Sequence, residues 1–142
     1  MTDSITIIDR LHPKISETFR SVEEIFQNQV NDIKSQYKTQ FALKAEELDN
    51  YFELKPELVK LHKEVISIIN GRYKKAENII ETSTEELKQL IHEYIPEYHD
   101  LVDTYLDEEL KNCKEVMSKL VREIKEEIND FAYACIEKVV FG

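Results

Sequence analysis

Glycine and proline are scarce in this chain of 142 residues, which contains two glycines and three prolines. All-β proteins need many tight turns, and such turns are built largely from these two residue types. The residues that dominate are instead Glu, Ile, Lys and Leu, which helices favour or tolerate. Hydrophobic residues make up 42% of the chain, which is enough for a packed core. The composition therefore predicts an all-α protein.

The chain also has no excess of basic charge and no long apolar run, and we expect no leader peptide. A formal net charge of −10 argues against binding to DNA, RNA or anionic membrane surfaces, because these polyanions attract Lys and Arg. No stretch approaches the ~20 apolar residues needed to cross a bilayer, and residues 1–14 lack the pattern of a signal peptide. We therefore expect a cytoplasmic protein. A secreted protein in which Met1 replaces a removed signal peptide would show the same sequence.

The three prolines are nearly evenly placed, and each is followed by a charged and then an apolar residue: Pro13, Pro56 and Pro96. Proline is tolerated in the first turn of a helix, where its missing N–H is not needed. The spacing predicts an elongated antiparallel bundle of three long amphipathic helices, at about residues 14–53, 57–94 and 97–140.

This bundle is expected to form a single domain over residues 1–142, with a loosely ordered N-terminal segment at 1–13. An alternative is a four-helix bundle with a break near residues 70–84. Asn70-Gly71 is a common helix stop, and Ser83 with Glu86 fits a capping box that would start a new helix.

Apolar residues recur at a spacing of eleven, which is about three helical turns and keeps them on one stripe. The rows are Ile15, Phe26, Tyr37 and Leu48; Phe19, Val30, Phe41 and Phe52; Tyr94, Tyr105 and Val116; and Leu106, Met117, Ile128 and Val139. Twelve residues are expected to be mostly buried: Phe19, Phe26, Val30, Ile33, Tyr37, Leu87, Ile91, Tyr98, Val102, Leu120, Ile124 and Phe131.

The two cysteines, Cys113 and Cys135, are predicted to lie on one helix, ~33 Å apart along its axis. A disulfide requires Cα atoms within about 7 Å, so neither a bridge nor a shared metal ion fits this distance. The same stripe also carries Ile91, Val102 and Ile124, which follow one another and the two cysteines at steps of eleven from residue 91 to residue 135. Both cysteines are therefore interpreted as small apolar core residues.

Four acidic residues at the start of the third predicted helix form a candidate partner-binding face: Asp100, Asp103, Asp107 and Glu108. The three aspartates share one helical face that is suited to a basic segment of another protein. The alternative is a solvated face near a helix N-terminus, where the helix dipole favours acids.

The histidines do not follow the Glu-x-x-His pattern of metal-binding bundles. His92 and His99 are seven residues apart, and His99 lies four residues before Asp103, so the three residues outline a loose cation site. Because Pro96 interrupts this face, we expect structural or solvent-exposed histidines and neither metal nor cofactor.

Catalytic patterns are also lacking, since the chain has neither a G-x-S-x-G elbow nor a glycine-rich phosphate loop. The sequence therefore predicts a non-enzymatic helical module for protein–protein interaction or for a regulatory or structural role, with a protein partner or self-association as in coiled coils.

The alternative is an exchangeable carrier of lipid or another apolar ligand. The eleven-residue rows are similar to those of exchangeable apolipoproteins, in periodicity and without a shared motif. The absence of tryptophan and the negative charge make membrane or lipid binding the less favoured hypothesis.

Overall fold

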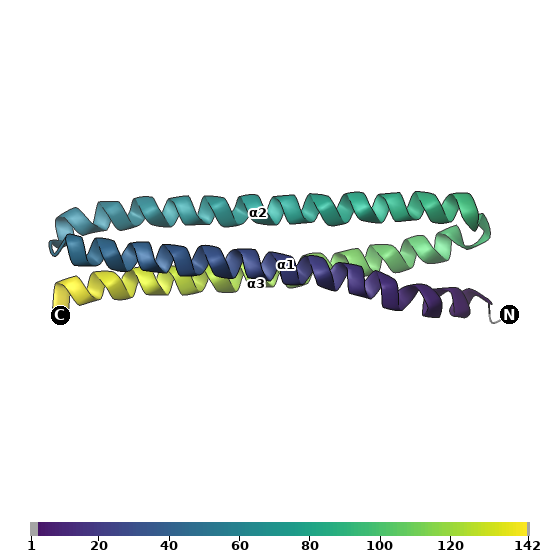
Figure 1. The fold of residues 1–142 in the computed structure, drawn as a ribbon, viewed down its shortest axis with the longest axis horizontal. Coiled ribbons are helices and arrows are strands. Elements are labelled where there is room, and N and C mark those ends of the chain that lie inside the picture. The colour runs from purple at the N-terminus through teal and green to yellow at the C-terminus, as the bar shows by residue number, and fades with distance from the viewer. Residues whose placement is uncertain (1–2, 142) are drawn as a thin grey trace. The chain divides into compact units, whose positions relative to one another are not determined.

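Three long helices make up nearly all of residues 3–141, the part of the chain that the computed structural model describes, with side chains from residue 7 onward. They are α1 (Asp3–Glu47), α2 (Tyr51–Tyr94) and α3 (His99–Phe141), with a short 3₁₀ helix, η1 (Pro96–Tyr98), before α3 (Figure 1). No strand occurs among these described residues. The prediction of an all-α three-helix bundle is confirmed.

The described residues divide into two compact units, and each unit contains one segment of every helix. Unit 1 holds α1 up to Phe26, α2 from Lys74 onward and α3 up to Ser118, and unit 2 holds the remaining segments. Each unit is therefore a small three-helix bundle with its own core. Residues 1, 2 and 142 of the predicted domain lie outside the described residues.

Contacts between side chains fix the directions of the helices within each unit. In unit 1, residues 12 and 19 of α1 contact residues 105 and 113 of α3, and in unit 2, residues 34 and 38 of α1 contact residues 127 and 131 of α3, so the contacts advance along both helices in the same sense. Helix α1 therefore runs parallel to α3 in each unit, and α2 runs in the opposite direction.

Helix α1 begins within residues 1–13, the segment expected to be loosely ordered, and the described part of that segment is helical from Asp3 onward. Pro13 lies inside the helix instead of opening it. Proline in a helix interior costs about 3 kcal/mol, since it removes one hydrogen bond and crowds the preceding turn. Apolar contacts offset this cost: Ile15 is buried and Leu11 is half-buried. Helix α1 ends at Glu47, which is earlier than the predicted residue 53.

The start of α2 is set by Asn50 and not by Pro56. The Asn50 side-chain oxygen accepts a hydrogen bond from the N–H of Phe52 at 2.8 Å, and its carbonyl accepts the N–H of Leu54 at 2.9 Å. These are the contacts of an N-cap residue, for which asparagine is among the best choices. Helix α2 therefore begins at Tyr51, and Pro56 lies inside it, near its first turn. The prediction that the third proline precedes a helix is confirmed, because Pro96 begins the short 3₁₀ helix that leads into α3.

Helix α2 is continuous through Asn70-Gly71, so the four-helix alternative with a break near residues 70–84 is wrong. Gly71 has no positive φ, and Thr84 lies in the helix interior, where its hydroxyl donates to the carbonyl of Ile80 at 2.7 Å. The local stop signals are overridden because buried residues, such as Ile69 and Ala76, continue on both sides of Gly71.

The cores of both units follow the eleven-residue spacing. In α1 and α3 the predicted rows are largely confirmed by the buried residues Ile15, Phe26, Tyr37, Phe19, Val30, Phe41, Leu106, Met117 and Ile128. In α2 the same spacing gives rows that the sequence analysis did not single out: Leu54, Val65 and Ala76, and Leu58, Ile69, Ile80 and Ile91. Every helix thus contributes two adjacent buried stripes.

Of the twelve residues predicted to be mostly buried, seven are buried and five are half-buried. The half-buried residues are Ile33, Leu87, Tyr98, Leu120 and Phe131. Three row members were predicted wrongly, because Phe52, Tyr94 and Val116 are exposed. Phe52 lies in the first turn of α2, so the row of α1 that was predicted to include it had been extended past the end of α1. Tyr94 is the last residue of α2, so the row that joins it to Tyr105 crosses from α2 into α3.

Candidate functional site

The predicted acidic face lies in unit 1, at the start of α3, where three of its four carboxylates contact cationic or imidazole groups of the same chain. Asp103 bonds His92 of α2, with 2.9 Å between the carboxylate and Nε2. Asp107 bonds the ammonium of Lys88 in α2, and Asp100 lies 2.9 Å from Nε2 of its neighbour His99.

These contacts fix the alignment of α3 against α2 in unit 1. Along α2, residues 81, 88 and 92 pair in order with residues 114, 107 and 103 of α3. Each step along α2 is thus matched by an equal step back along α3, as required for antiparallel helices. The hydrogen bond to Asp107 also raises the pKa of the Lys88 ammonium, against the smaller opposing effect of burial. The paired acids therefore align α2 and α3, and Glu108 is left exposed beside them.

The histidines near the α2–α3 connection lie close together. The rings of His92 and His99 meet edge to face with 5.3 Å between centroids, and His99 Nδ1 donates a hydrogen bond to the carbonyl of Pro96 at 2.8 Å. Within the described part of the chain, no three His, Cys, Asp or Glu side chains are placed to hold a metal ion. These histidine contacts join the end of α2, the connection at Pro96 and the start of α3.

Both cysteines are free and buried, Cys113 in unit 1 and Cys135 in unit 2, as predicted for core residues. The Cys113 thiol lies 3.8 Å from the carbonyl of Phe19. Burial, reinforced by the nearby Glu23 carboxylate, raises its pKa to about 12. The thiol is therefore protonated at neutral pH and is a poor nucleophile, since the reactive form is the thiolate.

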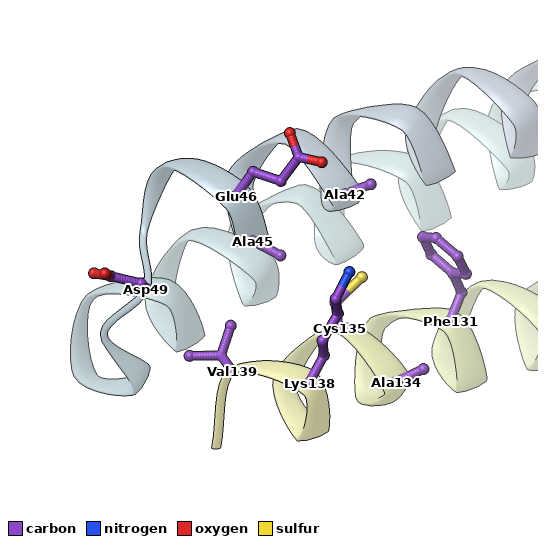
Figure 2. Close-up of a pocket in the computed structure, with 9 residues that line it drawn as sticks. All are labelled: Ala42, Ala45, Glu46, Asp49, Phe131, Ala134, Cys135, Lys138 and Val139. Carbon is purple, nitrogen blue, oxygen red and sulfur yellow. The ribbon is translucent and has the colours of Figure 1, made fainter. Parts of the chain in front are cut away.

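A cavity of about 480 Å³ lies in unit 2, between the C-terminal parts of α1 and α3 (Figure 2). Most of its lining is apolar, with charged side chains at its edge: Ala42, Ala45, Glu46, Asp49, Phe131, Ala134, Cys135, Lys138 and Val139. Phe131, Cys135 and Val139 project from α3 toward α1, whereas Glu46 and Asp49 point away from the hollow (Figure 2).

Small side chains create this cavity. The α1–α3 core of unit 2 is filled at one level by the Phe41 and Phe131 rings, whose centroids are 6.5 Å apart. Beyond that level, α1 presents Ala42 and Ala45, and α3 presents Ala134 and Cys135, which are too small to fill the space between the helices. The sequence analysis missed the site, and its available signal was this cluster of small residues near the C-terminal ends of two helices.

A smaller hollow of about 220 Å³ lies in unit 1 between α1 and α2. Its walls include Leu11 and Ile15 on one side and Thr84 and Leu87 on the other. The hydroxyls of Thr84 and Thr18, which also line this hollow, are already bonded to the carbonyls of Ile80 and Lys14.

Comparisons with family models, with curated protein sequences and with solved structures find no match for this chain. Among residues 3–141, no helix carries an apolar stretch of the length needed to cross a membrane. The function must therefore be argued from the surfaces and cavities themselves.

Proposed function

We propose that the chain is a non-enzymatic helical module that binds another protein through the outer face of α2 in unit 1. A regulatory or structural role, with self-association as a further property, belongs to the same proposal. The proposal places the binding surface on α2, because three of the four acids in the predicted acidic face are already paired within the chain.

A row of exposed apolar side chains carries this proposal. Ile79 is 57% exposed, Leu90 is 51% exposed and Tyr94 is 74% exposed. Ile79 and Leu90 are eleven residues apart, the spacing of the core rows, so they share one face of α2. Single exposed hydrophobic residues are normal on protein surfaces, whereas an aligned set is typical of a surface that a partner covers.

The energy available from such a surface is substantial, because complete burial of an Ile or Leu side chain contributes about 1.5–3 kcal/mol. The net charge of −10 adds a long-range attraction to a basic partner. A protein with an apolar helical face framed by Lys or Arg fits both features.

Affinity capture from the native source tests this proposal. The variant Ile79→Glu/Leu90→Glu places charge in the row without touching the core, and Val116→Glu is the matched control on an exposed apolar residue of α3. We expect the wild type and the control to retain a stoichiometric partner that the double variant loses, with unchanged helicity in all three. Capture of no stoichiometric partner, together with a monomeric mass by light scattering, would contradict the proposal.

A second candidate function, carriage of an apolar ligand, is favoured by the cavity in unit 2. Its volume of about 480 Å³ falls within the range of small-molecule sites. Ligands that bind the folded state raise its melting temperature, so melting curves with and without fatty acid or liposomes separate the two functions. A protein-binding module shows no shift, whereas a carrier shows a sharp rise.

A further inference from the structure

The smaller hollow of unit 1, between α1 and α2, is continuous with the exposed row of α2. Ser83 and Leu87 line the hollow from α2. Ile79 lies four residues before Ser83. Leu90 lies three residues after Leu87, and residues three or four apart are neighbours on a helix surface. The row that carries the proposed function therefore extends without interruption into the hollow.

Helix α1 supplies a matching row on the other side of the hollow. Leu11 and Thr18 line the hollow from α1 and are seven residues apart. Ile25 follows Thr18 by another seven residues, which is about two helical turns, and its side chain is 59% exposed. Exposed apolar residues thus continue both rows, at position 25 of α1 and at positions 79 and 90 of α2. The two rows and the hollow between them are called the α1–α2 surface below.

The spacing and the length of the α2 row match the contact of one further helix. The row runs at steps of three and four residues, the spacing of coiled-coil seams, through residues 79, 83, 87, 90 and 94. From Ile79 to Tyr94 it covers ~22 Å of helix. The hollow within this length measures about 220 Å³. An apolar cavity of about 150 Å³ holds a benzene ring, so the hollow has room for a large apolar side chain of a partner.

Two unpaired carboxylates border the α2 row. Glu86 lies four residues before Leu90 and Glu93 lies three residues after it, and both side chains are exposed. Unlike the paired aspartates of α3, neither glutamate forms an ion pair or a hydrogen bond with the described residues. Across the hollow, Lys14 contributes to the α1 wall. A partner on the α1–α2 surface therefore meets negative charge along α2 and positive charge along α1.

We infer that the α1–α2 surface binds a single amphipathic helix of another protein, which inserts an apolar side chain into the hollow and places Lys or Arg residues, seven apart, over Glu86 and Glu93. The inference rests on the proposed function and names the class of its partner. Charge complementarity selects this occupant, because a basic flank offsets the two carboxylates and an acid on the opposite flank meets Lys14. Amphipathic helices are recognised in this way in apolar grooves of other proteins.

A second copy of the chain fills this surface less well. Under two-fold symmetry the second copy would present the same surface, so that one hollow would face the other and space at the centre of the contact would stay unfilled. An anionic membrane is disfavoured by the unpaired carboxylates. A helix with a projecting apolar side chain satisfies both the shape and the charge of the surface.

A synthetic helix tests the inference. The probe is a fluorescent peptide of three heptads with Leu at the a and d positions, Lys at g and Glu at e, used at a concentration at which it is monomeric alone. Fluorescence anisotropy should show that the peptide binds the chain of 142 residues. A second peptide, with Glu at both e and g, should bind at least about tenfold more weakly, because its g flank is repelled by the two carboxylates.

Charge reversal shows whether the peptide lies along α2. Glu86→Lys/Glu93→Lys should reverse the preference, so that the peptide with Glu on both flanks binds more tightly. The matched control is Glu108→Lys/Glu115→Lys, which makes the same change in net charge at the same spacing on exposed acids of α3. The control should keep the preference of the wild type. An equal reversal in both double variants would show an effect of net charge alone and would overturn the inference.

Ile25 separates this inference from the proposed function, because Ile25 belongs to α1 and the proposed function uses α2 alone. Ile25→Glu should weaken the binding of the peptide with Lys at g by about tenfold or more. Val116→Glu, on an exposed residue of α3, should not, and circular dichroism should show unchanged helicity in both variants. A native partner that is lost in Ile79→Glu/Leu90→Glu but retained in Ile25→Glu would leave the proposed function standing and contradict the inference.

Three further results would overturn the inference. The first is a wild type that does not bind the peptide with Lys at g. The second is a dimer of the chain that sedimentation velocity detects and that Ile25→Glu abolishes, which would make a second copy the occupant. The third is binding to neutral phosphatidylcholine vesicles that Ile25→Glu abolishes, which would make lipid the occupant. Peptide binding with the expected pattern, but without a stoichiometric partner in the native source, would instead contradict the proposed function and leave a helix-binding surface.

Discussion

Replacement of Gly71 by alanine tests whether α2 is continuous, because the substitution should stabilise the protein if Gly71 lies inside a helix and destabilise it if Gly71 ends one. Gly71 lies in the helix interior without a positive φ, and a Cβ atom built on it meets no heavy atom within 4 Å. The substitution therefore adds neither a clash nor a packing contact. What remains is the difference in helix propensity and in the freedom of the unfolded chain, which favours alanine by about 1 kcal/mol.

For a chain of 142 residues, a gain of about 1 kcal/mol corresponds to a rise in melting temperature of about 3 °C. Urea denaturation followed by circular dichroism measures the change directly, and the midpoint should rise with an unchanged slope. Lys74→Ala, an exposed substitution in the same helix, should stay within about 0.5 kcal/mol. A loss of stability in Gly71→Ala would refute the reasoning, because a glycine that ends a helix in the left-handed conformation resists a side chain.

Three further predictions follow from burial. Ile124→Ala should cost about 2–5 kcal/mol in urea denaturation, and a loss below about 1 kcal/mol would mean that the core rows are misassigned. Burial raises the pKa of the Glu23 carboxyl above 4.5, so the ionisation of Glu23 destabilises the fold as pH rises through that raised pKa. Glu23→Gln should therefore raise the melting temperature at neutral pH. This gain in stability should disappear below about pH 4, where Glu23 is protonated in both the folded and the unfolded state. In a Cys135→Ala background, Cys113 should react with a thiol reagent no faster than the protein opens, and rapid labelling of the folded state would contradict the raised pKa of about 12.

The fold was largely predictable, because the buried residues recur at a regular spacing that can be recognised in the sequence. Residues such as Phe26 and Tyr37, or Met117 and Ile128, recur at a spacing of eleven and are buried together. The helix boundaries were less predictable. Pro13 reads locally as a helix start, yet packing on both sides of it extends the helix.

The candidate binding surfaces and the cavity were not predictable, because they depend on how the helices are aligned against one another, and a single sequence does not specify that alignment. The pairing of Asp103 with His92 and of Asp107 with Lys88 requires the alignment of α3 against α2. The cavity requires small residues from two helices to meet at one level. The exposed α2 row was nevertheless accessible, since the spacing of eleven that identified the core also relates Ile79 to Leu90.

The mass of the complex that the protein forms in its native source tests the central claim most directly. We expect light scattering on the tagged chain of 142 residues, purified without denaturation, to give a mass well above the 16.8 kDa of one chain, with a partner or a second copy in fixed stoichiometry. A mass of one chain at every concentration, with no co-purifying protein, would contradict the account of this bundle as an interaction module.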